Sequence, residues 1–217
     1  MNHRARVVVL GSGVGSNFEA LAAHADANYE IVAVGSDRRT APILDRAGDR
    51  GISTFVVAAA DYPDCAAHDT ALAAALTARR PDWIALAGYL RILGSATLAA
   101  WPERILNIHP ALLPNFPGLD THRRALAAGA CEHGATVHFV TAALDAGPRI
   151  LQARLAVHED DTETTLHARV QALEHRIYPR ALDWCASGRV SMKDGIACMD
   201  GMPLTAPIIF DEDSPCD

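Results

Sequence analysis

Short apolar runs alternate with stretches of helical composition along the first half of the chain. Residues 7–10, 30–34, 54–57, 83–87 and 104–108 are rich in Val, Ile and Leu, which predicts strands that are buried on both faces. Residues 17–24, 42–50 and 65–80 lie between them and predict helices. This alternation predicts an α/β fold, with a doubly wound, mostly parallel twisted sheet flanked by helices.

The pattern changes after residue 108. Three prolines and a glycine within residues 110–118 predict an irregular loop. Residues 136–140 and 150–157 alternate as strands of a half-exposed or antiparallel edge do, and residues 161–186 predict one long helix that Pro179 should kink. Two Asp-Gly pairs, at 194–195 and 200–201, predict hairpins, and the acidic end, residues 211–217, is expected to fray. We therefore expect a single domain over residues 1–187, followed by a C-terminal hairpin and acidic tail over residues 188–217.

Net charge and cysteine content indicate which partners and which cellular location to expect. The chain has 217 residues, a formal net charge of -7 and five cysteines without a Cys-x-x-Cys pair. Because nucleic acids and anionic membranes attract broad positive surfaces, we expect small-molecule partners instead, with no nucleic acid and no membrane. Unpaired cysteines favour reduced thiols and a cytoplasmic location. No apolar stretch reaches the roughly 18 residues of a membrane span.

A glycine-rich segment, Gly11-Ser12-Gly13-Val14-Gly15-Ser16-Asn17, follows the first strand and precedes a helix. Glycines let a ligand approach the backbone, and the N–H groups at a helix start favour an anion such as phosphate. A dinucleotide fingerprint would place glycine at position 16 and an acidic residue about 20 positions further on, and neither is evident. A mononucleotide or sugar phosphate is therefore favoured over NAD. The alternative is a tight turn in which Ser16 or Asn17 only caps the helix.

Asn107-Ile108-His109-Pro110 stands at the carboxyl end of a predicted strand, where open α/β sheets bind their ligands. Residues two apart share a face, so the Asn107 amide and the His109 imidazole should point into one crevice, where they could polarise a carbonyl. The alternative is a hydrogen-bonded core pair. Asp145, in a turn before Gly147-Pro148, could accept a proton or pair with His109, although Asp is also an ordinary turn residue.

Other candidates carry weaker signals. His109, His122, His133 and His138 are close in sequence but lack a usual ligand spacing, so no metal is predicted. A Ser-His-Asp hydrolase would need a Gly-x-Ser-x-Gly elbow, which is missing. Cys131 fits a small filler better than a nucleophile, Arg91 fits an acidic ligand or a solvated side chain equally well, and Glu174-His175 fits a surface pair.

Considered together, the motifs resemble the folate-dependent glycinamide ribonucleotide formyltransferases of purine biosynthesis, from residue 7 to about residue 204. The segments that carry the resemblance are Gly13-Val14-Gly15-Ser16-Asn17, Ala87-Gly88-Tyr89-Leu90-Arg91-Ile92-Leu93, Asn107-Ile108-His109-Pro110-Ala111-Leu112-Leu113-Pro114, Phe116-Pro117-Gly118, Glu132-His133-Gly134, Val137-His138-Phe139-Val140, Leu144-Asp145-Ala146-Gly147-Pro148 and Glu174-His175-Arg176-Ile177-Tyr178-Pro179.

The resemblance implies a formyltransferase fold with a Rossmann-like N-terminal half. It also implies transfer of a formyl group from 10-formyltetrahydrofolate, as co-substrate, to the amine of glycinamide ribonucleotide, with no metal and no NAD. Residues 1–105 would form the phosphate-binding half and residues 106–187 the catalytic and folate-binding half of a monomer or homodimer. Asn107 and His109 would steady the oxyanion, and Asp145 would manage the proton that leaves the amine.

The same resemblance assigns the binding residues. The ribonucleotide would contact Gly15, Ser16, Asn17 and Glu174; the folate would contact Leu90, Arg91, Ile92, Val140, Thr141, Leu144 and Asp145; Thr136 and His138 would support the site.

The chain departs from the family pattern at four positions. Val14 replaces a common asparagine, Ala111 a serine and Ala146 a glycine, and Cys65 stands roughly where some relatives carry an arginine that reaches the folate. Two alternatives remain: another user of 10-formyltetrahydrofolate, such as a deformylase or a sugar-amine or methionyl-tRNA formyltransferase, and a non-catalytic nucleotide-binding module. The former often carries a further domain, and the latter would not need Asn107, His109 and Asp145 together.

Overall fold

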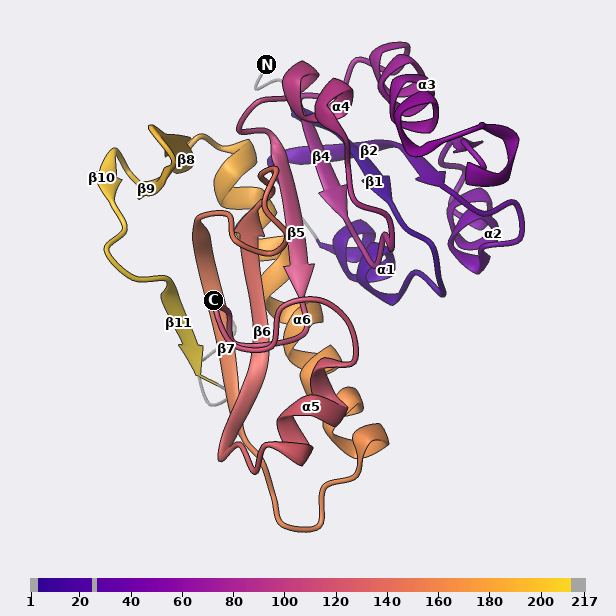
Figure 1. Cartoon of the computed structure of the whole chain (residues 1–217). Helices are drawn as coiled ribbons and strands as arrows, with labels where there is room; N and C mark the ends of the chain where they lie inside the picture. Colours follow the sequence, from indigo (N-terminus) through magenta and orange to yellow (C-terminus); the bar gives the residue numbers. More distant parts are fainter. Residues whose placement is uncertain (1–3, 25–26, 212–217) are drawn as a thin grey trace.

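An eight-stranded sheet forms the centre of the computed structural model, which describes residues 4–24 and 27–211 (Figure 1). The strand order is β11-β7-β6-β5-β4-β1-β2-β3. The strands are β1 Ala5–Leu10, β2 Tyr29–Ser36, β3 Thr54–Val56, β4 Trp83–Leu86, β5 Ile105–His109, β6 Glu132–Phe139, β7 Arg149–Ala156 and β11 Ile208–Asp211. The helices are α1 Ser16–Ala23, α2 Pro42–Asp49, η1 Ala59–Asp61, α3 Cys65–Thr77, α4 Ser95–Ala100, α5 Thr121–Ala127 and α6 Glu163–Ala186.

The sheet is parallel except for β6, which is antiparallel to both β5 and β7. This confirms the predicted doubly wound, mostly parallel sheet. Strand order runs outward from β1 in one direction and from β4 in the other, so the carboxyl ends of these two strands mark the switch point where such sheets form a ligand crevice.

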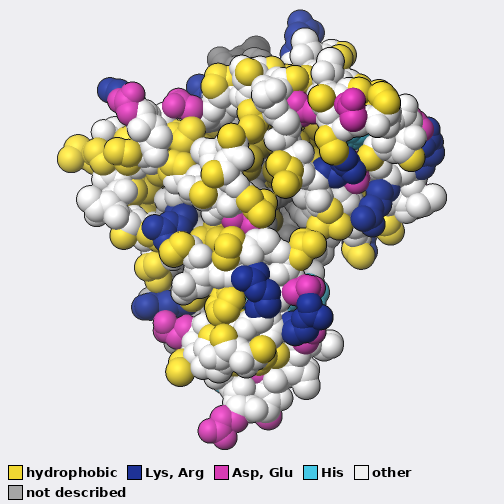
Figure 2. All heavy atoms as spheres, viewed as in Figure 1, with side chains coloured by type: hydrophobic (Ala, Val, Ile, Leu, Met, Phe, Trp, Pro, Cys, Tyr) yellow, Lys and Arg dark blue, Asp and Glu magenta, His cyan; other side chains and the backbone are white. Residues whose placement is uncertain are grey.

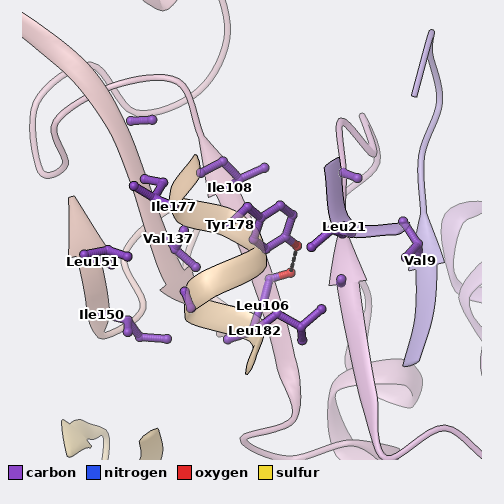
Figure 3. Packing of buried hydrophobic residues seen from close by; sticks show 14 of the residues in the cluster. Val9, Leu21, Leu106, Ile108, Val137, Ile150, Leu151, Ile177, Tyr178 and Leu182 are labelled. Atoms are coloured by element: carbon purple, nitrogen blue, oxygen red, sulfur yellow. Dashed lines mark hydrogen bonds between the residues drawn. The ribbon is translucent and has the colours of Figure 1, made fainter. Parts of the chain in front are cut away.

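Two hydrophobic clusters cover the two faces of the sheet. Alternate residues of β1 enter different clusters: Val7 and Val9 pack with residues of α1, α2 and α6, whereas Val8 and Leu10 pack with residues of α3. Burial on both faces explains why these strands are continuous apolar runs in the sequence. In the larger cluster the hydroxyl proton of Tyr178 of α6 is shared between the carbonyl oxygens of Leu86, at 2.9 Å, and Leu106, at 3.2 Å. Figure 3 shows Tyr178 beside Leu106. The long helix is thereby fixed to the two central strands that lead to the crevice.

The C-terminal part forms a small second sheet and then returns to the main one. β8 Val190–Lys193, β9 Ile196–Met199 and β10 Met202–Pro203 form a three-stranded antiparallel sheet. Both Asp-Gly pairs sit at its turns with positive φ, as predicted. β11 then pairs in parallel with β7, which the sequence did not predict.

Several expectations need correction. β6 and β7 pair in antiparallel fashion as expected, but β6 is an interior strand that is buried except at Glu132, because β7 and β11 lie beyond it. α4 and α5 were not predicted. As predicted, α6 is one long helix, which continues through Pro179 to Ala186, and its kink at Pro179 stays a prediction. Of the expected frayed end, residues 212–217 lie outside the described residues.

No membrane-spanning helix is found among the described residues, and the face shown in Figure 2 carries no broad basic patch. None of the described helices combines the length and apolar composition needed to cross a bilayer. On the face shown in Figure 2, basic and acidic side chains are interspersed among apolar ones and do not gather in one area.

Candidate active site

The carboxyl end of β5 and the facing residues of β6 place the predicted polar side chains together. In the antiparallel register Asn107 lies opposite His138, and His109 lies opposite Thr136. Because Asn107 and His109 are two residues apart, both side chains enter the same cavity, as predicted. The reversed direction of β6 is what allows His138 and Thr136 to meet the end of β5.

A hydrogen bond from Asn107 to His138 orients the Asn107 amide. Asn107 Nδ2 lies 3.2 Å from His138 Nε2, and His138 Nδ1 lies 2.8 Å from the Phe139 carbonyl oxygen. The carbonyl requires a proton on Nδ1, so in the neutral ring Nε2 accepts from the amide. Burial lowers the pKa of His138, which favours this neutral form. The second N–H of the Asn107 amide remains available to a ligand.

His109 and Asp145 form a buried pair, and Asp145 Oδ1 also lies 3.8 Å from His138 Nε2. His109 Nε2 lies 2.9 Å from the Phe116 carbonyl oxygen, and His109 Nδ1 lies 3.5 Å from Asp145 Oδ2. Their side chains are only 6% and 8% exposed. The Gly118 N–H donates to Asp145 Oδ2 at 2.8 Å, and Asp145 itself has a left-handed backbone with φ of 50°. The carboxylate is thus held beside an imidazole in a position where it can receive a proton.

Thr136 supports the loop that supplies these backbone contacts. Its hydroxyl donates to the Ala111 carbonyl at 2.7 Å and accepts from the Leu113 N–H at 3.1 Å and from Gln152 Nε2 at 2.9 Å. Thr136 is completely buried. It therefore holds residues 110–118 in place from beneath the site and does not itself face a ligand.

A cavity of about 440 Å³ opens from these groups. The residues that the resemblance assigned to folate all line it: Leu90, Arg91, Ile92, Val140, Thr141, Leu144 and Asp145. Leu90, Ile92 and Leu144 are 57%, 75% and 58% exposed, which is unusual for large apolar side chains and fits a surface that a flat aromatic ligand covers. The Arg91 guanidinium contacts Cys65 Sγ at 3.5 Å at an exposed position, which both solvent and an acidic ligand can reach.

The glycine-rich loop lies next to this cavity and contacts α6. Gly15 is the residue before α1, with φ of 86°, and no side chain caps the helix, so the alternative in which Ser16 or Asn17 only caps it is wrong. The Ser16 hydroxyl instead accepts from Gln171 Nε2 at 3.1 Å. A side chain at position 15 would also approach Ile43 to 2.7 Å, so glycine is required there.

Glu174 is buried, and the expectation of a surface pair with His175 is wrong. The Asn17 amide donates to Glu174 Oε2 at 2.8 Å. Burial raises the pKa of Glu174 to about 7, although the Asn17 hydrogen bond acts in the opposite direction. A carboxyl group removed from water in this way is typical of a functional site.

Three features of the site were not found from the sequence. The carbonyl of Phe116 and the N–H of Gly118 are backbone groups, which leave no mark in residue type. Asp37 directly follows β2 and was overlooked as an acidic residue at a strand end; its carboxylate accepts a hydrogen bond from Ser12 at 2.5 Å.

A second cleft, of about 690 Å³, lies between α1, α2 and α6, and Ser16 is one of the residues that line it. The arginines that line this cleft are Arg46, Arg50, Arg176 and Arg180.

The histidines and cysteines of the described chain show no sign of a metal centre. His122 Nδ1 and His133 Nε2 lie 3.1 Å apart in a buried ring contact, and burial lowers the pKa of each to about 4. No three His, Cys, Asp or Glu side chains among the described residues are placed to hold an ion. Cys65, Cys131, Cys185 and Cys198 are free thiols. Of the core or helix-end filler expected at Cys131, the core position is wrong, because Cys131 is exposed and follows the end of α5.

Comparison with known proteins shows the family of this chain. Residues 5–182 match the model of the formyl transferase family. The phosphoribosylglycinamide formyltransferase of Escherichia coli strain K12 is 44% identical over 201 residues, which cover 91% of this chain and 95% of the relative. The solved phosphoribosylglycinamide formyltransferase of Coxiella burnetii is 43% identical with a TM-score of 0.90, covering 95% of this chain and 99% of that one. Since the family model spans well over half of the chain, the chain belongs to the formyl transferase family.

Proposed function

We propose that this protein transfers the formyl group of 10-formyltetrahydrofolate to the amine of glycinamide ribonucleotide, giving formylglycinamide ribonucleotide and tetrahydrofolate in de novo purine biosynthesis. The observation that carries the proposal is the convergence of Asn107, His109 and Asp145 at one cavity, beside a glycine-rich loop suited to phosphate. Relatives that share 44% and 43% of their residues with this chain are named for the same activity.

The three side chains divide the work of acyl transfer. The substrate amine attacks the formyl carbon, and the carbonyl oxygen becomes an oxyanion. The free N–H of Asn107 donates to this oxyanion, and the adjacent His109 adds positive potential when protonated. Asp145 accepts the proton that the attacking amine loses. When the oxyanion collapses, the bond between the formyl carbon and the folate nitrogen breaks, and that nitrogen takes up a proton, which gives tetrahydrofolate. Since the nucleophile belongs to the substrate, no acyl-enzyme residue is needed.

Backbone donors account for recognition of the phosphate. Gly15 and the first turn of α1, with Ser16 and Asn17, direct N–H groups at it, as anion sites at helix starts do. Val14 is 59% exposed and offers no hydrogen bond, so this chain depends on the backbone more than relatives with asparagine at that position. Glu174 contacts the glycinamide end of the substrate.

The folate occupies the cavity between residues 88–93 and 140–145. Leu90, Ile92 and Leu144 cover its rings, and Arg91 reaches its acidic tail. Cys65 offers no charge to that tail, so Arg91 carries more of the interaction than where a second arginine is present. We place the enzyme in the cytoplasm as a monomer or homodimer that needs neither metal nor NAD, with residues 1–105 serving the phosphate and residues 106–187 the chemistry.

A two-substrate assay tests the proposal. Purified protein should form formylglycinamide ribonucleotide and tetrahydrofolate from both substrates without ATP or added metal. His109→Ala or Asp145→Ala should remove most turnover and leave ribonucleotide binding largely intact, whereas Thr77→Val, an exposed change at the end of α3, should do neither. Well-folded protein that forms no product between pH 6 and 9 would refute the activity, and full turnover in the two alanine variants would refute the site.

A further inference from the structure

Ser12 lies between the two loops that serve the two substrates. Its N–H donates to the Gly88 carbonyl at 3.0 Å, and its hydroxyl oxygen accepts from the Leu90 N–H at 3.0 Å. One residue thus connects the glycine-rich loop with residues 88–93 through its main chain and its side chain. Ser12 is only 2% exposed, so water does not compete for these contacts.

Asp37 fixes the direction of the Ser12 hydroxyl. A hydroxyl has one proton to donate, and here it goes to Asp37 Oδ1 at 2.5 Å. The oxygen lone pairs then face the Leu90 N–H. A hydrogen bond to a carboxylate is stronger than one between neutral groups, so this arrangement is more rigid than a serine hydroxyl alone would be. Asp37 directly follows β2 and does not line the cavity, so its hydrogen bond to Ser12 is its link to the ligand loops, while its charge also acts on Tyr89 of the cavity wall.

The two loops that Ser12 connects carry different ligand contacts. Three residues after Ser12 the chain reaches Gly15, Ser16 and Asn17 at the start of α1, while Leu90, Arg91 and Ile92 line the 440 Å³ cavity. We propose that Ser12, oriented by Asp37, is a positioning residue that couples the two substrate sites, so that occupation of either site raises affinity at the other. The inference rests on the proposed function, because it takes the two loops to bind the ribonucleotide and the folate.

The physical reason is shared ordering. A ligand that fixes one loop also restricts the other through Ser12, so the second ligand loses less conformational entropy on binding. By linkage the effect must be reciprocal, and coupling of this kind typically changes affinity by about 5-fold or more. Without the Ser12 hydroxyl the Leu90 N–H loses this partner and only the backbone bond from Ser12 to Gly88 still joins the two loops, so the coupling should weaken.

Calorimetry measures the coupling directly. The Kd of glycinamide ribonucleotide is determined with and without saturating tetrahydrofolate, the product that cannot transfer a formyl group. We expect a ratio of about 5 or more in the unmodified enzyme. Ser12→Ala and Asp37→Ala should each lower the ratio towards one, and the double variant should add little, since the two side chains act as one unit. Asp37→Asn, which keeps an acceptor oxygen, should restore part of the ratio.

A matched control separates coupling from stability. Tyr29→Phe also removes a buried hydroxyl, which donates to the Leu21 carbonyl at 2.9 Å, but Tyr29 is the first residue of β2, at the opposite end of that strand from the site. It should lower stability without changing the coupling ratio. In steady-state kinetics Ser12→Ala should raise the KM of each substrate most when the other is saturating, with a smaller change in kcat.

The outcomes are distinct. A ratio near one in the unmodified enzyme, or an unchanged ratio in both Ser12→Ala and Asp37→Ala, overturns the coupling while the proposed function stands. If Ser12→Ala does not fold, Asp37→Ala decides, because Asp37 lies outside both loops. If the unmodified enzyme binds neither ligand, the proposed function fails and the coupling with it.

Discussion

Removing the Thr136 hydroxyl tests whether the loop over the site is held from below. Thr136→Val keeps the shape of the side chain and deletes three hydrogen bonds, to Ala111, Leu113 and Gln152. The Leu113 N–H retains the Ala111 carbonyl at 3.1 Å, and Gln152 retains the Leu113 carbonyl at 2.7 Å, so no backbone group is left wholly unpaired. The loss is therefore that of three ordinary hydrogen bonds.

Each buried hydrogen bond contributes about 0.5–1.5 kcal/mol net, so the free energy of unfolding should fall by roughly 2–4 kcal/mol. A domain of ordinary stability, about 5–15 kcal/mol, stays folded after such a loss. Because the same loop supplies the Phe116 carbonyl to His109 and the Gly118 N–H to Asp145, kcat/KM should fall by about 10- to 100-fold as well.

Urea unfolding and steady-state kinetics provide the measurement. The midpoint should move with little change in the slope, since the surface exposed on unfolding is nearly the same. Thr77→Val makes the same chemical change at an exposed helical position and should alter stability by less than about 0.5 kcal/mol. The reasoning would be refuted if the free energy of unfolding of Thr136→Val fell by less than about 1 kcal/mol. It would also be refuted if that free energy fell by the predicted amount while kcat/KM stayed unchanged.

Three further predictions concern other parts of the molecule. Asp145→Asn should lower kcat by about 100- to 1000-fold and leave the Kd of the ribonucleotide nearly unchanged, because the amide cannot accept the proton of the attacking amine. A small change of kcat in a steady-state assay would argue against a proton acceptor at this position. Burial raises the pKa of Glu174 from 4.5 to about 7, so its contribution to the free energy of unfolding is fully present below pH 4.5 and is lost as the pH rises through 7. Between these pH values the free energy of unfolding should fall by roughly 3 kcal/mol more in the unmodified enzyme than in Glu174→Gln. Urea unfolding at several pH values measures this, and parallel pH profiles for the two proteins would contradict it. Tyr178→Phe removes the hydroxyl that contacts Leu86 and Leu106 and should lower the unfolding free energy by about 1–2 kcal/mol, which calorimetry of thermal unfolding would detect; an unchanged Tm would show that the hydroxyl does not matter.

The sequence predicted the sheet well because burial on both faces leaves continuous apolar runs. It did not predict α4 and α5, which are only six and seven residues long and carry little periodicity. β11 was missed because it is only four residues long and, in the sequence, looks like part of the C-terminal tail. It forms a strand because the outer edge of β7 offers it hydrogen-bonding partners. These elements depend on tertiary contacts that local pattern does not record.

The site divides in the same way. Strand periodicity alone was enough to place Asn107 and His109 in one crevice. The resemblance of the ordered motifs to formyltransferases then added Asp145 to the predicted site. The backbone groups of Phe116 and Gly118 that hold His109 and Asp145 could not be inferred, since any residue supplies a carbonyl or N–H. Burial of Glu174 was hidden for another reason: charged residues are usually solvated, and only the approach of Asn17 from another helix explains the exception.

β11 also bears on how the protein can be handled. The strand covers β7, which is apolar and buried along most of its length. A chain shortened before residue 208 would present the bare hydrogen-bonding edge of β7 to solvent, and such edges recruit strands from other molecules. Truncated forms should therefore precipitate at concentrations where the longer chain stays in solution, and purification tags are better attached to the amino-terminal end.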